Sequence, residues 1–454
     1  MPRTSEIRDF TQGNITKQLV VFAAPLFLSN LLQVVYNMVD MIVVGNVLGE
    51  IGLSAVSVGG DITNFMTFFG MGFAAAGQVI IAQYIGAKQR DQLSRFVSTM
   101  AGFLMVSAAA ISVVCIILRE QILRLMNAPP EAFAEALMYS TICMVGLVFI
   151  YGYNIVSTVL RGMGDSKHPF VFISIAAVMN LALDVLFVAV FHMGAGGAAL
   201  ATVLSQGFSF VISLIFLTVH RDRFELRIRL SDFLHWEPHM LLDLMRLGMP
   251  MAIKSASIQF SKLFVNSWIN SYGVAVSAFA GIANKFNSVS NLVSNAMNTA
   301  GSTMVGQNIA AREFERVKQI LLRLFAITLS VAGVISIVIC LYPTQIFSIF
   351  TQEQDVLKIS YEFLPVAVLL FFGSACRAGM NALINGSGNY RINFVTAIMD
   401  GIVMRIGLAI LFGLVLDLKY VGFWLGDAVA GFTPFVIGLV FYFTGIWKEG
   451  RQKT

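Results

Sequence analysis

The sequence predicts an all-α membrane protein in which twelve transmembrane helices form two six-helix lobes, related by a pseudo-twofold axis along the membrane normal. Three observations support this prediction. Hydrophobic residues make up 57% of the chain and charged residues only 12%, whereas soluble domains carry about 25% charge. Apolar segments of roughly twenty residues, long enough to cross a bilayer, recur along the whole chain. The second half of the chain also repeats motifs of the first half.

The first six spans form an N-lobe at residues 18–219, preceded by a polar segment at residues 1–17. That segment has no small-residue cleavage site, so we expect a cytoplasmic lead-in and not a removable signal peptide. Each span is predicted from a run of mainly apolar residues. The six spans are expected at about residues 18–44, 54–84, 93–118, 134–160, 170–191 and 197–219.

A charged linker at residues 220–248 separates the N-lobe from a C-lobe at residues 249–446, and residues 447–454 form a short polar tail. The second lobe is again predicted from six mainly apolar runs. Its spans are expected at about residues 249–271, 277–309, 319–341, 360–384, 394–416 and 421–446.

Loop charge predicts the orientation. With cytoplasmic termini, the cytoplasmic loops and span ends hold about twenty-one Lys and Arg residues, and the outer loops hold only four. This is the asymmetry of the positive-inside rule. We therefore expect a multi-pass protein of the cell membrane with both termini in the cytoplasm. The excess of 30 basic over 25 acidic residues follows from this loop pattern and does not indicate a nucleic-acid partner.

The two halves repeat each other at a nearly constant offset. Residues 77–88 align with residues 301–312, which are 224 positions later, and Gly162-Met-Gly164 aligns with Gly386-Ser-Gly388 at the same offset. Pro25 and Pro250 are separated by 225 positions. Because six helices separate equivalent positions, both halves have the same orientation in the bilayer, as in many transporters with parallel repeats. Duplication kept only for stability is the alternative.

Charged residues inside the first lobe form the main candidate site. Asp40 lies in the span that contains Pro25, and a carboxylate at membrane depth indicates a functional site. Tyr36 precedes Asp40 by four residues, and Asn180 precedes Asp184 by four, so each pair shares one helix face. Thr202 lies on the next helix. This set of side chains suits proton binding or coordination of a hard cation such as Na⁺ at Asp40, Asn180, Asp184 and Thr202. The alternative is mutual hydrogen bonding that only holds helices together.

The second lobe does not repeat the acidic pair. At the repeat offset, Asp40 aligns with Phe264 or Val265, and Asp184 with Leu408 or Ala409. Thr202 aligns with Asp427. The second lobe has charges of its own, for which we expect pairing with one another, with a second ion site as the alternative. These charges include Lys254, Lys262, Lys285, Arg377, Asp400, Arg405 and Asp427.

The eighth span carries asparagines at helical spacing along one face. A face of amides is not expected to point at lipid, because each unsatisfied polar group there costs several kcal/mol. Two interpretations stay open: the face lines a wet cavity, or it holds helices together. The cavity-lining candidates are Asn284, Asn287, Asn291 and Asn295, and Asn298 continues the pattern.

Several chemistries lack support in the sequence. The cysteines lie in apolar segments without metal-type spacing, and the five histidines lie in loops or at span ends. His235 and His239 have metal-like spacing, but Pro238 interrupts the helix that they would need. No phosphate-binding Gly-Lys-Ser/Thr loop is present, so ATP hydrolysis is not indicated. We therefore expect no cofactor, no catalytic residue and no enzymatic activity.

With these residues in view, the chain resembles the multidrug and toxic compound extrusion (MATE) family over nearly its whole length. The resemblance implies a V-shaped pair of six-helix lobes that performs cation-coupled antiport of organic, often cationic, compounds. It also implies that Asp40, Tyr36, Asn180, Asp184 and Thr202 form an N-lobe cation or proton site, and that the first helix bends at Pro25. The matching stretches are residues 25–36, 40–45, 77–87 and 161–165, Asn180 with Asp184, and residues 197–202.

The second lobe departs from the resemblance. Some branches of the family carry an acidic residue in the seventh helix, where this chain has Ile258 and Gln259. An N-lobe mechanism is therefore favoured over a C-lobe sodium site.

The predicted function is export of organic, cationic or amphipathic compounds by alternating access, coupled to H⁺ or Na⁺. The alternative is a flippase or an exporter of a lipid-linked or polar metabolite. The expected partners are small organic substrates and membrane lipid, and the expected state is a monomer. An intramembrane enzyme is a further rival, but no catalytic Ser/His pair or metal-ligand cluster appears at membrane depth. A sensor or scaffold protein without transport is another, which a dye-efflux assay would separate.

Overall fold

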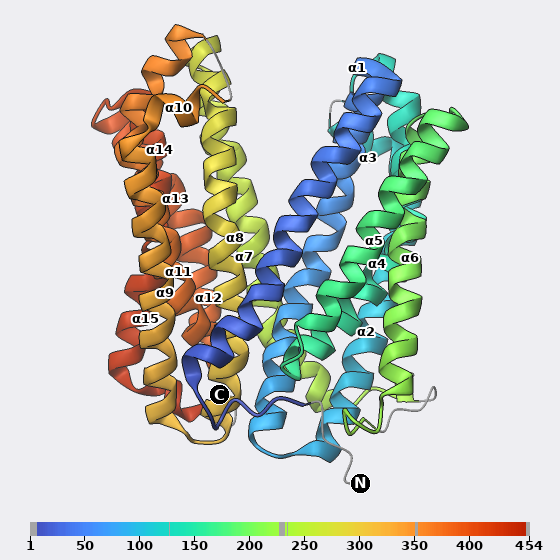
Figure 1. The fold of residues 1–454 in the computed structure, drawn as a ribbon, viewed down its shortest axis with the longest axis vertical. Helices are drawn as coiled ribbons and strands as arrows, with labels where there is room; N and C mark the ends of the chain where they lie inside the picture. The colour runs from blue at the N-terminus through green and yellow to red at the C-terminus, as the bar shows by residue number, and fades with distance from the viewer. Residues whose placement is uncertain (1–6, 127, 227–231, 234, 350–352, 451–454) are drawn as a thin grey trace. The chain divides into compact units, whose positions relative to one another are not determined.

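The computed structural model describes residues 7–126, 128–226, 232, 233, 235–349 and 353–450. Within these ranges the secondary structure is helical and contains no strand, which confirms the predicted fold class (Figure 1). Parts of the predicted terminal segments and of the linker lie outside these ranges, as do Arg3, Arg227, Arg229, Arg451 and Lys453, which contributed to the prediction of orientation.

The chain divides into two compact units. The first consists of Met1–Asp9 and Leu28–Gly248, and the second of Phe10–Phe27 and Met249–Thr454. The boundary after Gly248 coincides with the end of the predicted linker, but helix Pro238–Asn270 already includes residues 238–248 of that linker. Residues 18–27 belong to the second unit and not to the first lobe. Their apolar side chains explain this assignment, because Leu19 and Phe22 are fully buried in a core with residues of α8, α9 and α11.

The helices of the first unit surround α4. This helix packs against α2 and α6, and α5 packs against α6. The elements are α1 (Ile15–Gly86), α2 (Arg90–Ile117), α3 (Arg119–Leu125), the short 3₁₀ turn Pro130–Ala132, α4 (Phe133–Gly162), α5 (Lys167–Asp184), a π-helical turn η2 (Val185–Val190) and α6 (Gly194–Val219).

Helix α1 contains both of the first two predicted spans. It runs for 72 residues, and the position with non-helical backbone dihedrals inside it is Gly49, at φ 64° and ψ −156°. Glycine adopts a positive φ without the steric cost that other residues have, so the break falls where the sequence permits it. The two spans are therefore joined by one kinked turn and not by an extended loop.

The second unit is organised around α11, which packs against α8, α9, α14 and α15. The elements are α7 (Pro238–Asn270), α8 (Val274–Ala310), α9 (Phe314–Leu341), α10 (Pro343–Phe347), α11 (Gln354–Ser387), α12 (Tyr390–Ile398), η4 (Met399–Val403), α13 (Met404–Ile410), η5 (Leu411–Val415), α14 (Lys419–Ala430), α15 (Thr433–Thr444) and the 3₁₀ turn η6 (Ile446–Glu449). The turns η4 and η5 are π-helical.

The number of membrane crossings agrees with the prediction. In the described ranges, nine segments have the length and apolar composition of a membrane span, and one of them is α1, which contains two predicted spans. The helices α7 and α8 have 33 and 37 residues but are not among the nine. Charged side chains in α7 and amides in α8 lower their hydropathy. Counting α1 twice and adding α7 and α8 gives twelve crossings.

The repeated Gly-x-Gly motif forms the same turn in each unit. Gly164 follows α4 with φ +87°, and Gly388 follows α11 with φ +70°. Glycine is favoured in this left-handed region because a Cβ would clash with the following carbonyl. The other glycine of each motif is in close contact: a Cβ on Gly162 would lie 3.0 Å from the Gln78 carbonyl oxygen, and a Cβ on Gly386 would lie 2.8 Å from that of Ser302. The repeated sequences therefore specify equivalent helix contacts.

A π-helical turn explains why the repeat offset changes. The offset is 224 residues at Gly164 and Gly388 but 225 at Thr202 and Asp427. Between these positions the second unit contains the π-turn η4, whereas α5 of the first unit is regular there. A π-turn accommodates an additional residue, because its hydrogen bonds join residues i and i+5. Asp400 lies in this turn.

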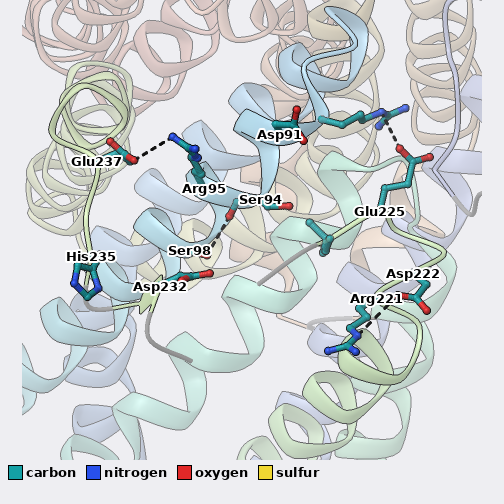
Figure 2. A pocket seen from close by; sticks show the side chains of 12 residues that line it. Asp91, Ser94, Arg95, Ser98, Arg221, Asp222, Glu225, Asp232, His235 and Glu237 are labelled. Atoms are coloured by element: carbon teal, nitrogen blue, oxygen red, sulfur yellow. Dashed lines mark hydrogen bonds and ion pairs between the residues drawn. The ribbon is translucent and has the colours of Figure 1, made fainter. Parts of the chain in front are cut away.

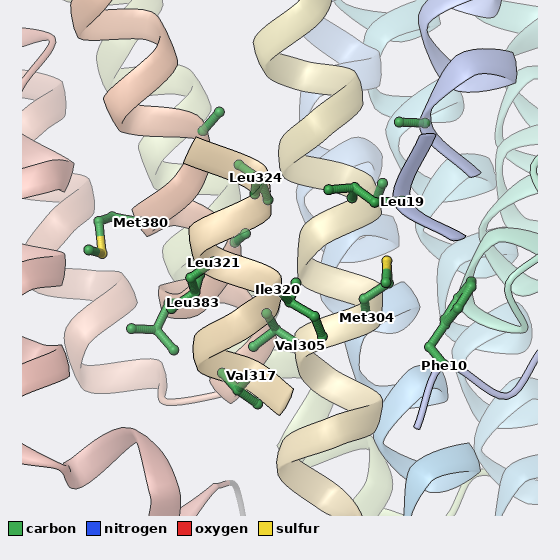
Figure 3. Close-up of a cluster of buried hydrophobic side chains, with 14 of the residues drawn as sticks. Phe10, Leu19, Met304, Val305, Val317, Ile320, Leu321, Leu324, Met380 and Leu383 are labelled. Carbon is green, nitrogen blue, oxygen red and sulfur yellow. The ribbon is translucent and has the colours of Figure 1, made fainter. Parts of the chain in front are cut away.

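The start of α1 is bound to the second unit by polar and apolar contacts. The Phe10 amide donates to Gln307 Oε1 over 2.9 Å, and Arg316 Nε donates to the Phe10 carbonyl over 2.8 Å. Figure 3 shows Leu19 and Phe10 beside Met304 of α8 in this core.

Candidate functional site

Two carboxyl groups approach each other inside the first unit. Asp40 lies in α1 and is half-buried, and Asp184 ends α5 and is 0% exposed. The two side chains are close enough for a direct carboxyl–carboxyl interaction. Among the described residues, neither oxygen of Asp184 has a hydrogen-bond partner, nor does Asp40 Oδ1, although all three are buried. Leaving a buried polar group unsatisfied costs about 1–3 kcal/mol, and more for a charged group. This arrangement can accept a proton or a cation.

The predicted amide and hydroxyl groups are also brought together. Asn180 Nδ2 donates to Thr202 Oγ1 over 3.5 Å, and Thr202 Oγ1 donates to the Ala198 carbonyl over 3.1 Å. Asn180 is buried and lies one turn before Asp184 in α5. Oxygen atoms from α5 and α6 are thus available beside the acidic pair, as coordination of a hard cation requires.

The predicted phenol of Tyr36 belongs to the same site. Tyr36 lies one helical turn before Asp40 and interacts electrostatically with Asp40, Asp184 and Tyr153. The hydroxyl of Tyr153 donates to the Pro169 carbonyl over 3.0 Å, which anchors this ring to the start of α5. Helices α1, α4 and α5 therefore all contribute to the surroundings of the acidic pair.

Two buried residues of α4 were missed in the sequence analysis. Tyr139 and Cys143 both interact electrostatically with Asp40. Tyr139 reaches this position because α1 has a glycine opposite it: a Cβ on Gly59 would lie 2.2 Å from Tyr139 Cδ1. An aromatic residue and a cysteine in an apolar span are typical of a core, so their residue types did not indicate a site. Their spacing of four residues was the one available clue.

The second unit contains a network of buried charges. Asp400 is 0% exposed and lies 3.2 Å from the Arg377 guanidinium and 3.3 Å from that of Arg405. Arg405 also pairs with Asp427. The prediction that charges of the second half pair with one another is therefore confirmed for these residues. Such pairing is needed at membrane depth, where a single charged side chain costs at least about 2.5–3.5 kcal/mol on insertion scales.

Lys254 and Lys262 of the second unit form no ion pair with a described residue, although Lys254 interacts electrostatically with Asp400 and Lys262 with Asp427. Lys254 Nζ donates to Asn381 Oδ1 over 2.7 Å but forms no ion pair. Lys262 forms neither a hydrogen bond nor an ion pair in the described part of the chain, and it lines a small cavity with Asp427. The charge network is thus incompletely paired on the α7 side.

The predicted asparagine face of α8 divides between the two proposed roles. Asn284 and Asn287 line the cavity that contains Lys262. Asn291 donates to Asn287 Oδ1 over 2.9 Å, and its own oxygen accepts from Ser374 of α11 over 3.3 Å. Asn295 is exposed. Asn298 accepts from Asn385 of α11 over 3.5 Å. One end of the face lines a cavity, and the rest lies against α11 or at the surface.

The predicted bend at Pro25 lies in the part of α1 that belongs to the second unit. The helix continues through Pro25, and its non-helical position is Gly49. A proline lacks the amide that would donate to the preceding turn, so it remains a weak point of the helix. The bend stays a prediction.

A charged pocket of about 770 Å³ lies in the first unit (Figure 2). It lies between the start of α2 and the connector after α6. Its charged side chains are partly paired, since Arg90 lies 3.3 Å from Glu225 and Arg95 lies 3.6 Å from Glu237. Glu237 is also held by its amide, which donates to Thr99 Oγ1 over 3.2 Å. These ion pairs hold helix α2 and the connector together, and we interpret the pocket as part of that contact.

Comparison with known families identifies the scaffold that carries these groups. The MatE family model matches residues 25–186 and again residues 250–411, so one family unit is present twice. The two matches begin 225 residues apart, which agrees with the internal repeat. The chain belongs to the MATE family.

Individual relatives support the same conclusion. The probable multidrug resistance protein YpnP of Bacillus subtilis is 30% identical over 446 residues, which cover 98% of this chain and 99% of YpnP. The probable multidrug resistance protein NorM of Thermotoga maritima is 23% identical over 96% of this chain and 94% of that protein. A MATE transporter solved in an outward-facing conformation matches with a TM-score of 0.89, at 22% identity, over 98% and 99% of the two chains. This MATE protein is therefore a multi-pass membrane transporter and not an enzyme.

The family repeat shows which site residues correspond between the two units. At the offset of 225, Asn180 corresponds to Arg405 and Thr202 to Asp427. The hydrogen bond of the first unit is thus replaced by an ion pair in the second. Asp40 and Asp184 correspond to Val265 and Ala409, which are both buried. The acidic pair is specific to the first unit.

Proposed function

We propose that this MATE transporter exports organic, cationic or amphipathic compounds in exchange for H⁺ or Na⁺, and that the coupling ion binds at Asp40 and Asp184. The observation that supports this proposal is the buried Asp184 carboxyl, whose oxygens have no hydrogen-bond partner among the described residues and which faces a second carboxyl. A proton or a monovalent cation would supply the missing partner. The neighbouring Asn180 and Thr202 oxygens would complete a Na⁺ site.

The coupling ion acts in this proposal through helix α1. Asp40 is in the first unit, whereas the first residues of the same helix, 15–27, are part of the second. Binding of a cation from outside reduces the negative charge at Asp40 and Asp184, and Pro25 lets α1 bend. Affinity for a cationic substrate then falls, and the substrate is released outside. Coupling requires that ion and substrate stabilise different conformations, because a ligand shifts an equilibrium only by its differential affinity.

The protein is proposed to reside in the cell membrane as a monomer surrounded by lipid, with both termini in the cytoplasm. The asymmetry of basic residues between the loops supports this orientation. Cysteine labelling of an engineered site in the loop after α2 and of one in the connector after α6 would test it. Labelling by an impermeant reagent from outside only at the first site supports the proposed orientation. Labelling at the second site contradicts it.

The central experiment is substrate efflux in proteoliposomes with an imposed pH or Na⁺ gradient. We expect Asp40→Asn and Asp184→Asn to lose gradient-driven transport by about 100-fold or more, since an amide cannot carry the exchanged charge. The matched control is Asp61→Asn, which removes an exposed carboxylate from the same helix α1. Full ion-driven efflux by Asp40→Asn would refute the proposal. Dependence on the pH gradient alone identifies H⁺ as the coupling ion, and dependence on the Na⁺ gradient alone identifies Na⁺.

A further inference from the structure

The second unit holds more buried positive charge than its carboxylates can neutralise. Four cationic side chains surround Asp400 and Asp427, so the network has a formal excess of two positive charges. Both carboxylates are already bound by guanidinium groups. The four cations are Lys254, Lys262, Arg377 and Arg405.

The excess charge is accessible at one point. Lys262 lines a cavity of about 30 Å³ and forms no hydrogen bond or ion pair with a described residue. Three amide side chains, Asn266, Asn284 and Asn287, line the same cavity. Ammonium and amide N–H groups are all donors, and together they can surround an acceptor. Asp427 also lines the cavity and interacts electrostatically with Lys262, but its ion-pair partner is Arg405, so one carboxylate serves two cations.

The size and walls of the cavity restrict the acceptor. The volume has room for about one or two water molecules, which suits the three heavy atoms of a carboxylate and not a diphosphate headgroup. The walls continue as apolar surface, formed by Val265, Leu370 and Trp424 among others. Trp424 is held edge-on against Phe363 with ring centroids 5.3 Å apart. A small anionic group attached to an apolar body would match both parts of this cavity.

We propose that the cavity is a subsite for the carboxylate of an amphipathic organic anion, with Lys262 as its counter-charge and the three amides as further donors. The subsite extends the transported compounds from cations to molecules that carry a carboxylate. This inference rests on the proposed export of organic compounds, but it does not depend on where the coupling ion binds. The first unit supplies negative charge for the cation, and the second supplies positive charge for the substrate anion.

Equilibrium binding to the purified full-length transporter tests the subsite. The probes are a dansyl-labelled alkyl carboxylate, its uncharged primary amide and the matching trimethylammonium compound. We expect the carboxylate to bind about tenfold more tightly than the amide to the unmodified protein, as one charge-assisted hydrogen bond allows. In Lys262→Gln this preference should fall below about twofold, while the affinity for the ammonium probe stays within about twofold. Lys262→Arg should keep the preference, because it keeps the charge and the donors.

A matched control is Lys318→Gln, which removes a lysine from the same unit that is paired with Glu315 at the start of α9. It should bind the carboxylate like the unmodified protein. Equal binding of carboxylate and amide, or an unchanged preference in Lys262→Gln, would overturn the proposal. Tighter binding of an alkyl phosphate than of the carboxylate would overturn it in favour of a phosphate headgroup. Asp40→Asn should retain the binding preference, so a failure of ion coupling and a failure of this subsite are distinguishable.

Discussion

The two units share a scaffold but differ in the charge that they bury. The first brings Asp40 and Asp184 together with no cationic partner in the described part of the chain, and the second places Asp400 between two arginines. At equivalent positions, the hydrogen bond from Asn180 to Thr202 becomes an ion pair. Repetition has therefore preserved the helix contacts and left the polar interior free to diverge. The site has to be identified from its side chains, because the fold alone does not specify it.

The largest effect on stability is expected at the ion pairs of Arg405 in the second unit. Arg405→Gln leaves Asp400 and Asp427 with fewer partners, and breaking a buried pair costs about 3–5 kcal/mol. The double variant Arg405→Asn with Asp427→Thr introduces the neutral pair found in the first unit. It should lose less stability than Arg405→Gln. Equilibrium unfolding in mixed micelles measures the free energy of unfolding of both variants. Equal losses in the single and double variants would show that the two residues do not act as a pair.

In the first unit, one substitution is expected to raise the stability of the protein. Asp184→Leu keeps the branched shape of the side chain and removes a buried carboxyl that has no hydrogen-bond partner among the described residues, so the free energy of unfolding should rise by about 1–3 kcal/mol. Ion-driven efflux should be lost in the same protein. Asn180→Leu serves as a control, because it removes a group that is hydrogen-bonded to Thr202 and should not stabilise. A destabilised Asp184→Leu would indicate that this carboxyl is satisfied in the folded protein.

The smallest loss of stability is expected at the repeated glycine turns, and it should be similar in both units. Gly164→Ala and Gly388→Ala each force an alanine into the left-handed region and should cost about 1–2 kcal/mol. Gly407→Ala is the control, because a Cβ at that helical position meets open space and alanine favours the helix. Thermal unfolding of the three variants compares them. A large difference between Gly164→Ala and Gly388→Ala would show that the repeated turns are not equivalent.

Most of the fold could be predicted because hydropathy and repetition act over many residues. The twelve spans follow from apolar runs, and Gly49 marks the kink between the two spans that make up α1. The assignment of Phe10–Phe27 to the second unit could not be predicted. Leu19 and Phe22 are apolar in either location, so composition does not reveal which helices bury them.

The candidate site was predictable where polarity at membrane depth is exceptional. Asp40 and Asp184 stood out for this reason, and helical spacing linked each to a neighbour. Tyr139 and Cys143 were missed because their residue types are ordinary in a helix core. The role of Gly59 depends on a single close approach between α1 and Tyr139, which sequence does not encode as a pattern.

The attachment of the first helix also sets the order in which the protein can assemble. Phe10 is among the first residues to leave the ribosome, yet Gln307, Asn308 and Arg316, which bind its backbone, are synthesised about 300 residues later. The second unit cannot close its core with its own later helices alone. A nascent chain therefore has to keep its earliest apolar segment available until almost the last helices have been inserted. Separate synthesis from Met249 onward would give a half that lacks part of its own core.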